Sequence, residues 1–169
     1  MDKNLICETN RLILRPFEIT DLEDLAAVYG DAEVMRYIGT GSLTIDETRK
    51  KLIAGMDAWR KHGFGAWAII CRTTGQFIGR TGLAHLDGTT DVHVGFVLDK
   101  RFWHRGLGYE AAIASISYGF ETLKLDKIFA AARATNTSSR RLLEKLGMTF
   151  ARDASYYGHA AVIYVLANA

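Results

Sequence analysis

Three short apolar segments follow one another with only turn residues between them, and this feature limits most narrowly how the chain can fold. The segments cover residues 66–72, 77–86 and 91–98, and Thr73-Thr74-Gly75 and Asp87-Gly88 separate them. Strands joined by turns this short pair antiparallel. The next strand, 127–134, comes only after a helical segment, 106–123, and such a crossover returns the chain in parallel. The sequence therefore predicts an α/β (α+β) protein with one mixed, mostly antiparallel sheet.

The remaining segments add strands to this sheet and helices to its faces. Residues 11–15 form a first strand that Pro16 ends, and two further strands close the chain, so the total is about seven. Apolar residues spaced by three and four predict the other helices. The closing strands are 148–157 and 160–167, and the other helices are 22–29, 32–37, 44–61 and 138–146. No linker, repeat or low-complexity stretch interrupts the 169 residues, so we expect one domain over 1–169.

Charge and cysteine content limit the partners of the chain. A formal net charge of +2 without a Lys/Arg block predicts no nucleic-acid partner. The longest apolar run, 66–71, is far shorter than the ~20 residues of a membrane span, and the first residues lack the apolar core of a signal peptide. We therefore expect a cytoplasmic protein without a membrane partner. Cys7 and Cys71 lie outside any Cys-x-x-Cys pair, so we expect free thiols and no metal site.

A glycine-bearing turn at the start of helix 106–123 is the first candidate site. It reads Trp103-His104-Arg105-Gly106-Leu107-Gly108-Tyr109-Glu110-Ala111. Its two glycines let a ligand approach the backbone closely, and the helix N-terminus offers unpaired N–H groups at the positive end of the helix dipole. The turn is therefore predicted to bind an anion such as a pyrophosphate, unless the glycines serve only to make a tight turn.

Two common phosphate-binding motifs fit this turn poorly. No lysine in the chain follows a glycine, which excludes a P-loop. The spacing of Gly106, Gly108 and Ala111 matches a dinucleotide fingerprint, but seven residues separate the preceding strand from Gly106, and strand 127–134 does not end in the ribose-binding acid. Consecutive hairpins also differ from the repeating βα units of that fold.

The second candidate site is the junction between strand 127–134 and helix 138–146. Asn136 lies at this junction. Its side chain could cap the helix, which the chemistry alone favours, or hydrogen-bond a ligand that lies across the sheet.

Taken together, the order and spacing of these segments resemble the GNAT superfamily of acetyl-CoA-dependent N-acetyltransferases. The similarity is greatest to the branch of ribosomal-protein N-terminal alanine/serine acetyltransferases and covers nearly the whole chain. The segments that carry it are 9–16, 33–37, 75–79, 93–96, 103–111 and 135–148. The pyrophosphate motif of the family falls on Trp103, Gly106 and Gly108, with Trp103 where the general pattern has Gln or Arg. His104 stands where the branch usually has Gly.

This resemblance implies the GNAT fold and a site for acetyl-CoA. In that fold strand 91–98 splays from strand 127–134, and pantetheine enters the gap as an additional strand. The contacts that the resemblance assigns to acetyl-CoA are backbone bonds at Phe96, Val97 and Leu98; the pyrophosphate turn at Trp103, His104, Arg105, Gly106, Leu107, Gly108 and Tyr109; and side-chain contacts at Asn136 and Ser139.

Transfer of an acetyl group from a thioester to an amine needs a base, a polarised carbonyl and a proton for the departing thiolate. A backbone N–H near Val97 or Leu98 is the candidate for the carbonyl. Many relatives carry a tyrosine acid at the position of Leu143, so that acid is missing here. Ser139 matches a serine of the branch and could donate to the sulfur, or could be only a first-turn helix residue.

Two histidines are candidates for the base. His93 occupies a position where relatives commonly have Glu, and an imidazole with a pKa near 6.5 accepts a proton at neutral pH. It could instead pack on the sheet with its ring bonded to a neighbour. His159 lies in the turn 156–159, which faces the acceptor in relatives, and could equally be an exposed turn residue.

The acceptor is expected to be a primary amine, either a protein N-terminal α-amine or a small molecule such as a polyamine, an amino acid or an aminated antibiotic. Its entrance would lie between residues 32–44 and the turn 156–159. Asp31 and Glu33 could attract a cationic amine there, or only complement a helix dipole. A non-catalytic acetyl-CoA-binding module is the alternative function, and the sequence allows a homodimer.

Overall fold

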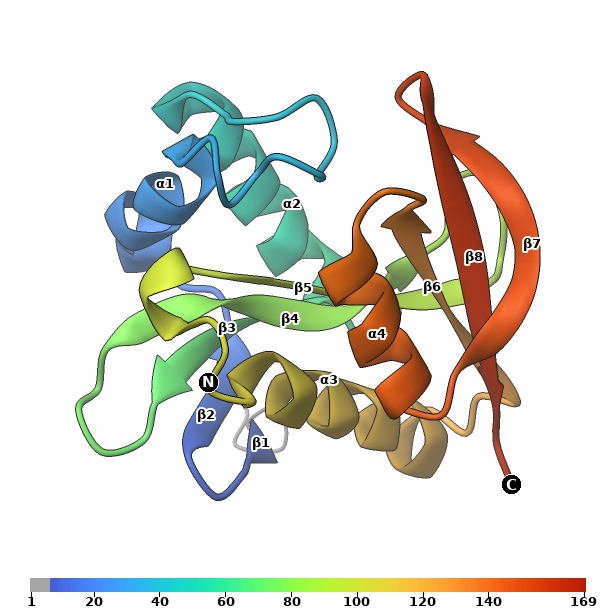
Figure 1. Cartoon of the computed structure of the whole chain (residues 1–169). Helices are drawn as coiled ribbons and strands as arrows, with labels where there is room; N and C mark the ends of the chain where they lie inside the picture. The colour runs from blue at the N-terminus through green and yellow to red at the C-terminus, as the bar shows by residue number, and fades with distance from the viewer. Residues whose placement is uncertain (1–6) are drawn as a thin grey trace.

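The computed structural model describes residues 7–169 and contains one eight-stranded sheet (Figure 1). The strand order is β1-β2-β3-β4-β5-β6-β8-β7, and every neighbouring pair is antiparallel except β5 and β6. The strands are β1 (Cys7–Glu8), β2 (Leu12–Pro16), β3 (Ala66–Cys71), β4 (Phe77–His85), β5 (Val92–Leu98), β6 (Lys127–Arg133), β7 (Thr149–Tyr156) and β8 (His159–Ala167). This confirms the predicted mixed, mostly antiparallel sheet and adds the short strand β1.

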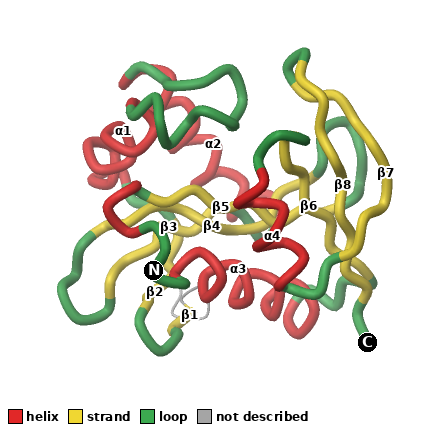
Figure 2. Tube along the Cα trace, viewed as in Figure 1, coloured by secondary structure: helices red, strands yellow, loops and turns green. Residues whose placement is uncertain are grey.

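Helices cover both faces of this sheet. The α-helices are α1 (Leu22–Gly30), α2 (Ile45–His62), α3 (Leu107–Ser117) and α4 (Thr137–Lys145). Short 3-10 helices lie at η2 (Ile19–Asp21) and η3 (Lys100–Phe102), and the π-helical turn η4 (Tyr118–Thr122) extends α3. Figures 1 and 2 show α1 and α2 on one side of strands β3 to β5, and α3 on the other. In the described chain no helix is long and apolar enough to cross a membrane.

The helix predicted over residues 32–37 is wrong. The chain forms successive turns there, in which the Met35 N–H bonds the Asp31 carbonyl at 3.0 Å and the Ile38 N–H bonds the Met35 carbonyl at 3.0 Å. The Asp31 side chain accepts the Glu33 N–H at 2.9 Å, and Gly39 follows with a φ of 50°. A local side-chain bond and a left-handed glycine together stop the helix before it can propagate.

The parallel pair β5 and β6 separates along its length. The only registered pair between the two strands is His93 with Phe129. Toward its C-terminal end β5 continues next to β4, up to the pair of Leu98 with Gly79, but no longer next to β6. This confirms the expected splay and leaves a fork in the sheet that starts at His93.

Side chains of β5 alternate between the two faces of the sheet. Val94 packs with Ile116 of α3 and Leu143 of α4. Val97 packs with Leu25 and Tyr29 of α1. His93 lies four residues before Val97, and the register with β4 is regular between them, so the His93 side chain points to the α1/α2 face.

Candidate active site

The fork between β5 and β6 exposes backbone hydrogen-bonding groups of β5. The Asp99 N–H bonds the Ile78 carbonyl at 2.9 Å, which fixes the alternation of bonds between β4 and β5. Backbone groups of Val97 therefore face β4, whereas those of Phe96 and Leu98 face the fork. The Leu98 carbonyl accepts the Trp103 indole N–H at 2.9 Å. Phe96 consequently offers both of its backbone groups to a strand-like ligand, and Leu98 offers its N–H.

The glycine turn meets the fork at the N-terminus of α3. Gly106 is the N-cap residue, with a φ of 74°, and no described side chain caps the helix. The first intrahelical bond joins the Glu110 N–H to the Gly106 carbonyl at 3.1 Å. The N–H groups of Leu107, Gly108 and Tyr109 therefore precede that bond and are available to an anion.

Gly108 is the point where three elements of the site come together. A Cβ built at Gly108 would lie 3.4 Å from Leu142 Cδ1 of α4, 3.8 Å from Leu98 Cδ1 and 4.0 Å from Phe96 Cδ2 of β5. The lack of a side chain at this position keeps the helix N-terminus open toward both neighbours. The predicted turn and the predicted fork thus form one continuous surface.

Two further features of the turn concern its shape. His104 adopts a φ of 59°, in the left-handed region that glycine enters most easily, at the position where the resembled branch usually has Gly. Lys145 of α4 lies 4.6 Å from the ring centroid of Tyr109. Both His104 and Arg105 are exposed, so the turn presents cationic or titratable side chains next to the open N–H groups.

Sequence reasoning missed a polar brace that holds the turn in place. Arg11 Nε bonds Glu110 Oε2 at 2.7 Å, Arg11 Nη1 bonds the Arg105 carbonyl at 2.8 Å, and Thr9 Oγ1 donates to Glu110 Oε1 at 2.6 Å. Burial alone would raise the pKa of Glu110, but the hydrogen bonds from Thr9 and Arg11 lower it overall. Local sequence patterns give no signal for this brace, because 99 residues separate Arg11 from Glu110.

Asn136 is the N-cap of α4, as its position in the sequence allowed. Its Oδ1 accepts the Ser139 N–H at 3.2 Å. Within the described residues its Nδ2 donates no hydrogen bond, so one half of the amide remains available to a ligand. Ser139 is half-buried beside it. Leu143, at the position of the tyrosine of many relatives, is 1% exposed in the core.

His93 lines a small cavity of about 50 Å³ on the α1/α2 face of the sheet. Its Nδ1 is buried and has no hydrogen-bond partner among the described residues. Burial lowers the pKa of His93, and the positive charge of Arg80 lowers it further. Asp87 and the backbone of Ala84 and His85 oppose this shift, although neither backbone segment reaches hydrogen-bonding geometry with Nδ1. The imidazole is therefore neutral at neutral pH, with a nitrogen free to accept a proton.

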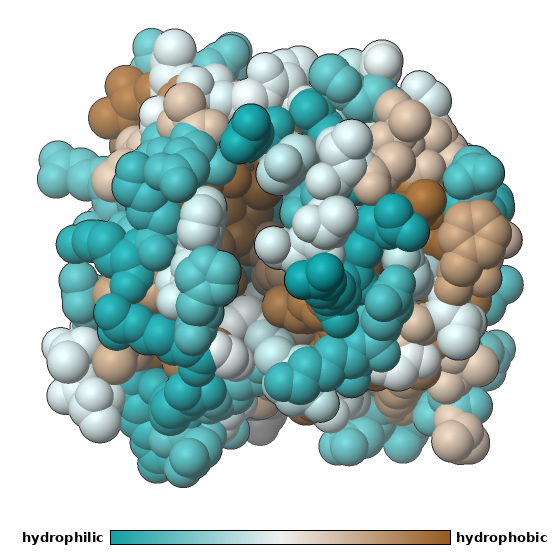
Figure 3. Space-filling model, in the orientation of Figure 1, coloured by the Kyte–Doolittle hydropathy of each residue, from teal (hydrophilic) through white to brown (hydrophobic). Residues whose placement is uncertain are grey.

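A second cavity, of about 160 Å³, opens beside the first and includes both segments predicted to form the acceptor entrance. Its lining comprises Tyr29, Met35, Ile38, Gly39, Thr40, Gly41, Leu43, Lys51, Arg80 and Tyr157. Figure 3 shows a hollow with apolar residues at its base near the centre of the face presented in Figure 1. His159 is exposed at the start of β8 and lines neither cavity.

Asp31 and Glu33 do not line this cavity, and both contact Lys100. Lys100 Nζ lies 3.0 Å from Asp31 Oδ2 and 3.1 Å from Glu33 Oε2. The Lys100 ammonium holds the pKa of Asp31 below its usual range. One ammonium balances one of the two carboxylate charges, and neither acid lines either cavity, so the attraction of a cationic acceptor by these two acids stays a prediction.

Arg133 and Arg80 are two further residues that sequence reasoning missed. Arg133, at the end of β6, donates to the Gly39 carbonyl at 2.7 Å and to the Arg36 carbonyl at 3.3 Å, which ties the turns after α1 to the fork. Arg80 lines both cavities. The only sequence signal for Arg80 is a charge inside an otherwise apolar strand with glycines at 79 and 82.

Comparisons with known proteins agree with this arrangement. The acetyltransferase (GNAT) domain family matches residues 11–149. The Bacillus subtilis (strain 168) protein named uncharacterized N-acetyltransferase YoaA is 33% identical over 84% of this chain and 81% of its own length. A GNAT-family acetyltransferase structure from Bacillus anthracis has a TM-score of 0.84 at 26% identity, covering 96% of this chain and 98% of that chain.

A structure of RimL, a ribosomal L7/L12 alpha-N-protein acetyltransferase in complex with coenzyme A, shares the fold. Its TM-score is 0.82 at 15% identity, over 96% of this chain and 97% of that chain.

Proposed function

The chain belongs to the GNAT acetyltransferase family, and on that basis we propose that it passes the acetyl group of acetyl-CoA directly to a primary amine, with His93 as the base. One observation carries this proposal. His93 lies where β5 and β6 part, with unpaired β5 backbone beyond it and two cavities on the face to which its side chain points.

The residues of the fork fit acetyl-CoA. The open N–H groups of Leu107, Gly108 and Tyr109 suit the pyrophosphate, because they combine unpaired donors with the positive end of the α3 dipole. Phe96 offers backbone groups to pantetheine as an added strand would use them, and Asn136 Nδ2 adds a donor from α4. When bound, acetyl-CoA supplies an acetyl group activated as a thioester.

His93 is the residue that removes a proton from the acceptor. A neutral imidazole can accept that proton from the amine or through a water in the cavity that His93 lines, and its buried, unpartnered Nδ1 is held by no described residue. In the overall balance a C–N bond forms, the C–S bond breaks, the amine proton passes to His93 and the sulfur leaves as a thiolate. Backbone N–H groups at the end of β5 polarise the carbonyl.

Ser139 is the proposed donor to the departing sulfur. It follows Asn136 by three residues, and the tyrosine position of many relatives holds the core residue Leu143. A coenzyme thiol is acidic enough for its thiolate to leave with little assistance, so a hydroxyl suffices here.

The amine is either a protein N-terminal α-amine or a small-molecule amine. Both would enter through the cavity of about 160 Å³ that Tyr157 and the residues after α1 line. His159 is the second proposed base, and its exposure makes it the weaker of the two.

Thiol release from acetyl-CoA across a panel of peptides and small amines tests the proposal, with coenzyme A binding measured separately by calorimetry. Turnover that depends on an amine supports the enzyme. Coenzyme A binding without turnover for any amine would instead favour a binding module of the same fold.

A further inference from the structure

A half-buried arginine without an ion-pair partner separates the two cavities. Arg80 Nε donates to Tyr29 Oη at 2.8 Å, and the guanidinium lies 6.0 Å from the ring centroid of Tyr29. Over residues 7–169 no carboxylate lies within 4.0 Å of Arg80, and its Nη atoms donate no hydrogen bond. A guanidinium removed from water normally has an anionic partner, so these Nη groups are available to one from outside.

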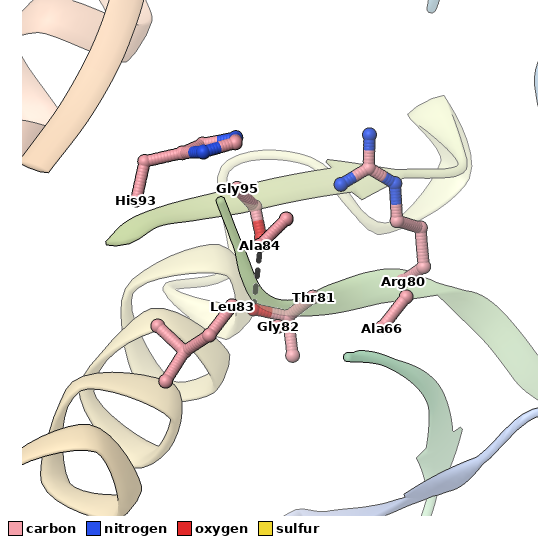
Figure 4. Close-up of a pocket in the computed structure, with 8 residues that line it drawn as sticks. All are labelled: Ala66, Arg80, Thr81, Gly82, Leu83, Ala84, His93 and Gly95. Carbon is pink, nitrogen blue, oxygen red and sulfur yellow. Dashed lines mark hydrogen bonds between the residues drawn. The ribbon is translucent and has the colours of Figure 1, made fainter. Parts of the chain in front are cut away.

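Arg80 leans along the sheet toward His93. A Cβ built at Gly95 would lie 3.1 Å from Arg80 Nη1, so the guanidinium occupies the space above this glycine. His93 precedes Gly95 by two residues on the same face of β5, a step of about 7 Å along a strand. Figure 4 shows the His93 ring and the Arg80 guanidinium on the same side of β4 and β5, with Gly95 between them. A group bound to Arg80 and a group beside His93 can thus belong to one small molecule.

The two cavities contain cationic but no acidic side chains. Lys51 is the second cation of the lining, and neither cavity has an Asp or Glu among the residues that line it. Asp31 and Glu33 line neither cavity, and both contact Lys100. The positive charge of the lining opposes the entry of polyamines and aminoglycosides, and it disfavours the ammonium form of any amine that binds there.

We infer that the acceptor is a primary amine that also carries a carboxylate, which the Nη groups of Arg80 bind while the amine lies beside His93. This inference rests on the proposed acetyl transfer. The planar fork of an arginine matches the two oxygens of a carboxylate, so Arg80 selects the acceptor and orients its amine. The carboxylate belongs either to a free amino acid or to an acidic side chain on the first residue of a peptide.

Rates of thiol release at pH 8, where His93 is neutral, test the inference. The panel contains glycine, β-alanine, γ-aminobutyrate and glutamate, each with its amide, together with putrescine. A peptide amide with N-terminal Glu, and its Gln counterpart, distinguish a peptide acceptor from a free amino acid. We expect at least one acid to exceed its amide in kcat/KM on the order of 10- to 100-fold, the range of a lost charge-assisted hydrogen bond. Equal rates for every acid and its amide would overturn the inference.

Arg80→Gln is expected to remove this preference, with a fall on the order of 10- to 100-fold for acids and little change for amides. Arg80→Lys, which keeps the charge but not the fork, is expected to retain part of it. Arg60→Gln is the matched control, because Arg60 is exposed on α2 and lines neither cavity. An equal loss for acids and amides in Arg80→Gln would contradict carboxylate binding.

Equilibrium binding keeps this test separate from the acetyl transfer itself. Calorimetric titration of the coenzyme A complex with glutamate and with γ-aminobutyrate is expected to show binding that Arg80→Gln weakens on the order of 10-fold or more. Such binding without thiol release would refute the proposed transfer and retain the carboxylate site. Thiol release with equal affinity for acids and amides would support the proposed transfer and refute the carboxylate site.

Discussion

Replacing His93 with alanine tests whether His93 is a catalytic base or only a packed residue of β5. The ring is half-buried and its Nδ1 has no hydrogen-bond partner in the described chain, so alanine breaks no hydrogen bond at that atom. The expected cost in unfolding free energy is therefore limited to the lost packing of one half-buried ring, about 1 kcal/mol. The loss of a general base costs on the order of 10²- to 10⁴-fold in turnover, or about 2.7 to 5.4 kcal/mol of transition-state stabilisation. Turnover should therefore fall far more than stability.

The pH dependence gives a second, independent signature. Burial and the charge of Arg80 lower the pKa of His93 from its ordinary 6.5, and the neutral form is the active one. The acid limb of kcat/KM should therefore have its midpoint below pH 6.5. Since the unfolded chain binds this proton more readily than the folded one, the unfolding free energy should decrease as pH falls below 6.5, down to the folded pKa. His93→Ala should lose both the acid limb and this contribution to the pH dependence of stability.

The assay combines thiol release from acetyl-CoA with one fixed amine, over about pH 5 to 9, and urea unfolding at the same pH values. His159→Ala is measured in parallel, because His159 is the second proposed base but is exposed and lines neither cavity. His93→Glu, which restores the residue common in the resembled family, should recover part of the turnover. If His93→Ala keeps near-full turnover and the same acid limb, the assignment of the base is refuted, and loss of the limb in His159→Ala would transfer the role to that residue.

Four further predictions concern the site and the two cysteines. In calorimetry, Gly108→Val should weaken coenzyme A binding on the order of 10-fold, because the side chain covers the α3 N–H groups. Gly108→Ala should not weaken it, because its Cβ makes only an ordinary 3.4 Å contact with α4. Unchanged affinity in both variants would place the pyrophosphate elsewhere. Asn136→Ala should lose about 1 kcal/mol of unfolding free energy and raise the KM for acetyl-CoA, while Asn136→Asp keeps the cap and raises only the KM; if neither variant changes the KM, Asn136 is only a cap. Arg133→Ala should raise the acceptor KM several-fold without changing coenzyme A affinity, because it releases the carbonyls of the cavity loop; an unchanged acceptor KM would show that this tether is dispensable. Hydrogen bonds from Thr74 and Thr73 lower the pKa of the Cys71 thiol to about 7, whereas burial raises the pKa of the Cys7 thiol. Iodoacetamide should therefore alkylate Cys71 first, with a midpoint near pH 7, as mass spectrometry can show. Equal alkylation rates for the two thiols would argue against this.

The elements that the sequence predicted correctly depend on interactions between near neighbours. Strands 66–72, 77–86 and 91–98 could be recognised because side-chain periodicity and turn residues act within a few positions of one another. The helix after Thr44 was predictable for the same reason, since Thr44 and Glu47 form a reciprocal cap three residues apart and Gly63 ends the helix in a left-handed conformation. The turns at 32–37 were missed because a side-chain bond from Asp31 competes with the helix over a segment too short to decide by periodicity.

The candidate site was likewise predictable from the sequence only in part. From the sequence alone came the glycine turn, the fork that the family resemblance implied, and the nomination of His93 and Asn136. Sequence could not say whether Asn136 caps or binds, and the fold shows that its Oδ1 caps while its Nδ2 remains free. Nor could it show that His93 and Arg80 share one face, because that follows from the register between β4 and β5.

The pairing of charges was decided by the tertiary structure alone. Lys100 and Glu33 are 67 residues apart in sequence, and the fold brings the Lys100 ammonium to 3.1 Å from the Glu33 carboxylate. Arg11 bonds Glu110, which lies 99 residues away in sequence. Arg80 has no carboxylate partner within the described chain. Local sequence sets which side chains a segment carries and on which face they alternate. Electrostatic interaction depends on distances of a few ångströms between segments, so only the folded chain determines which charges are neutralised and which remain for a ligand.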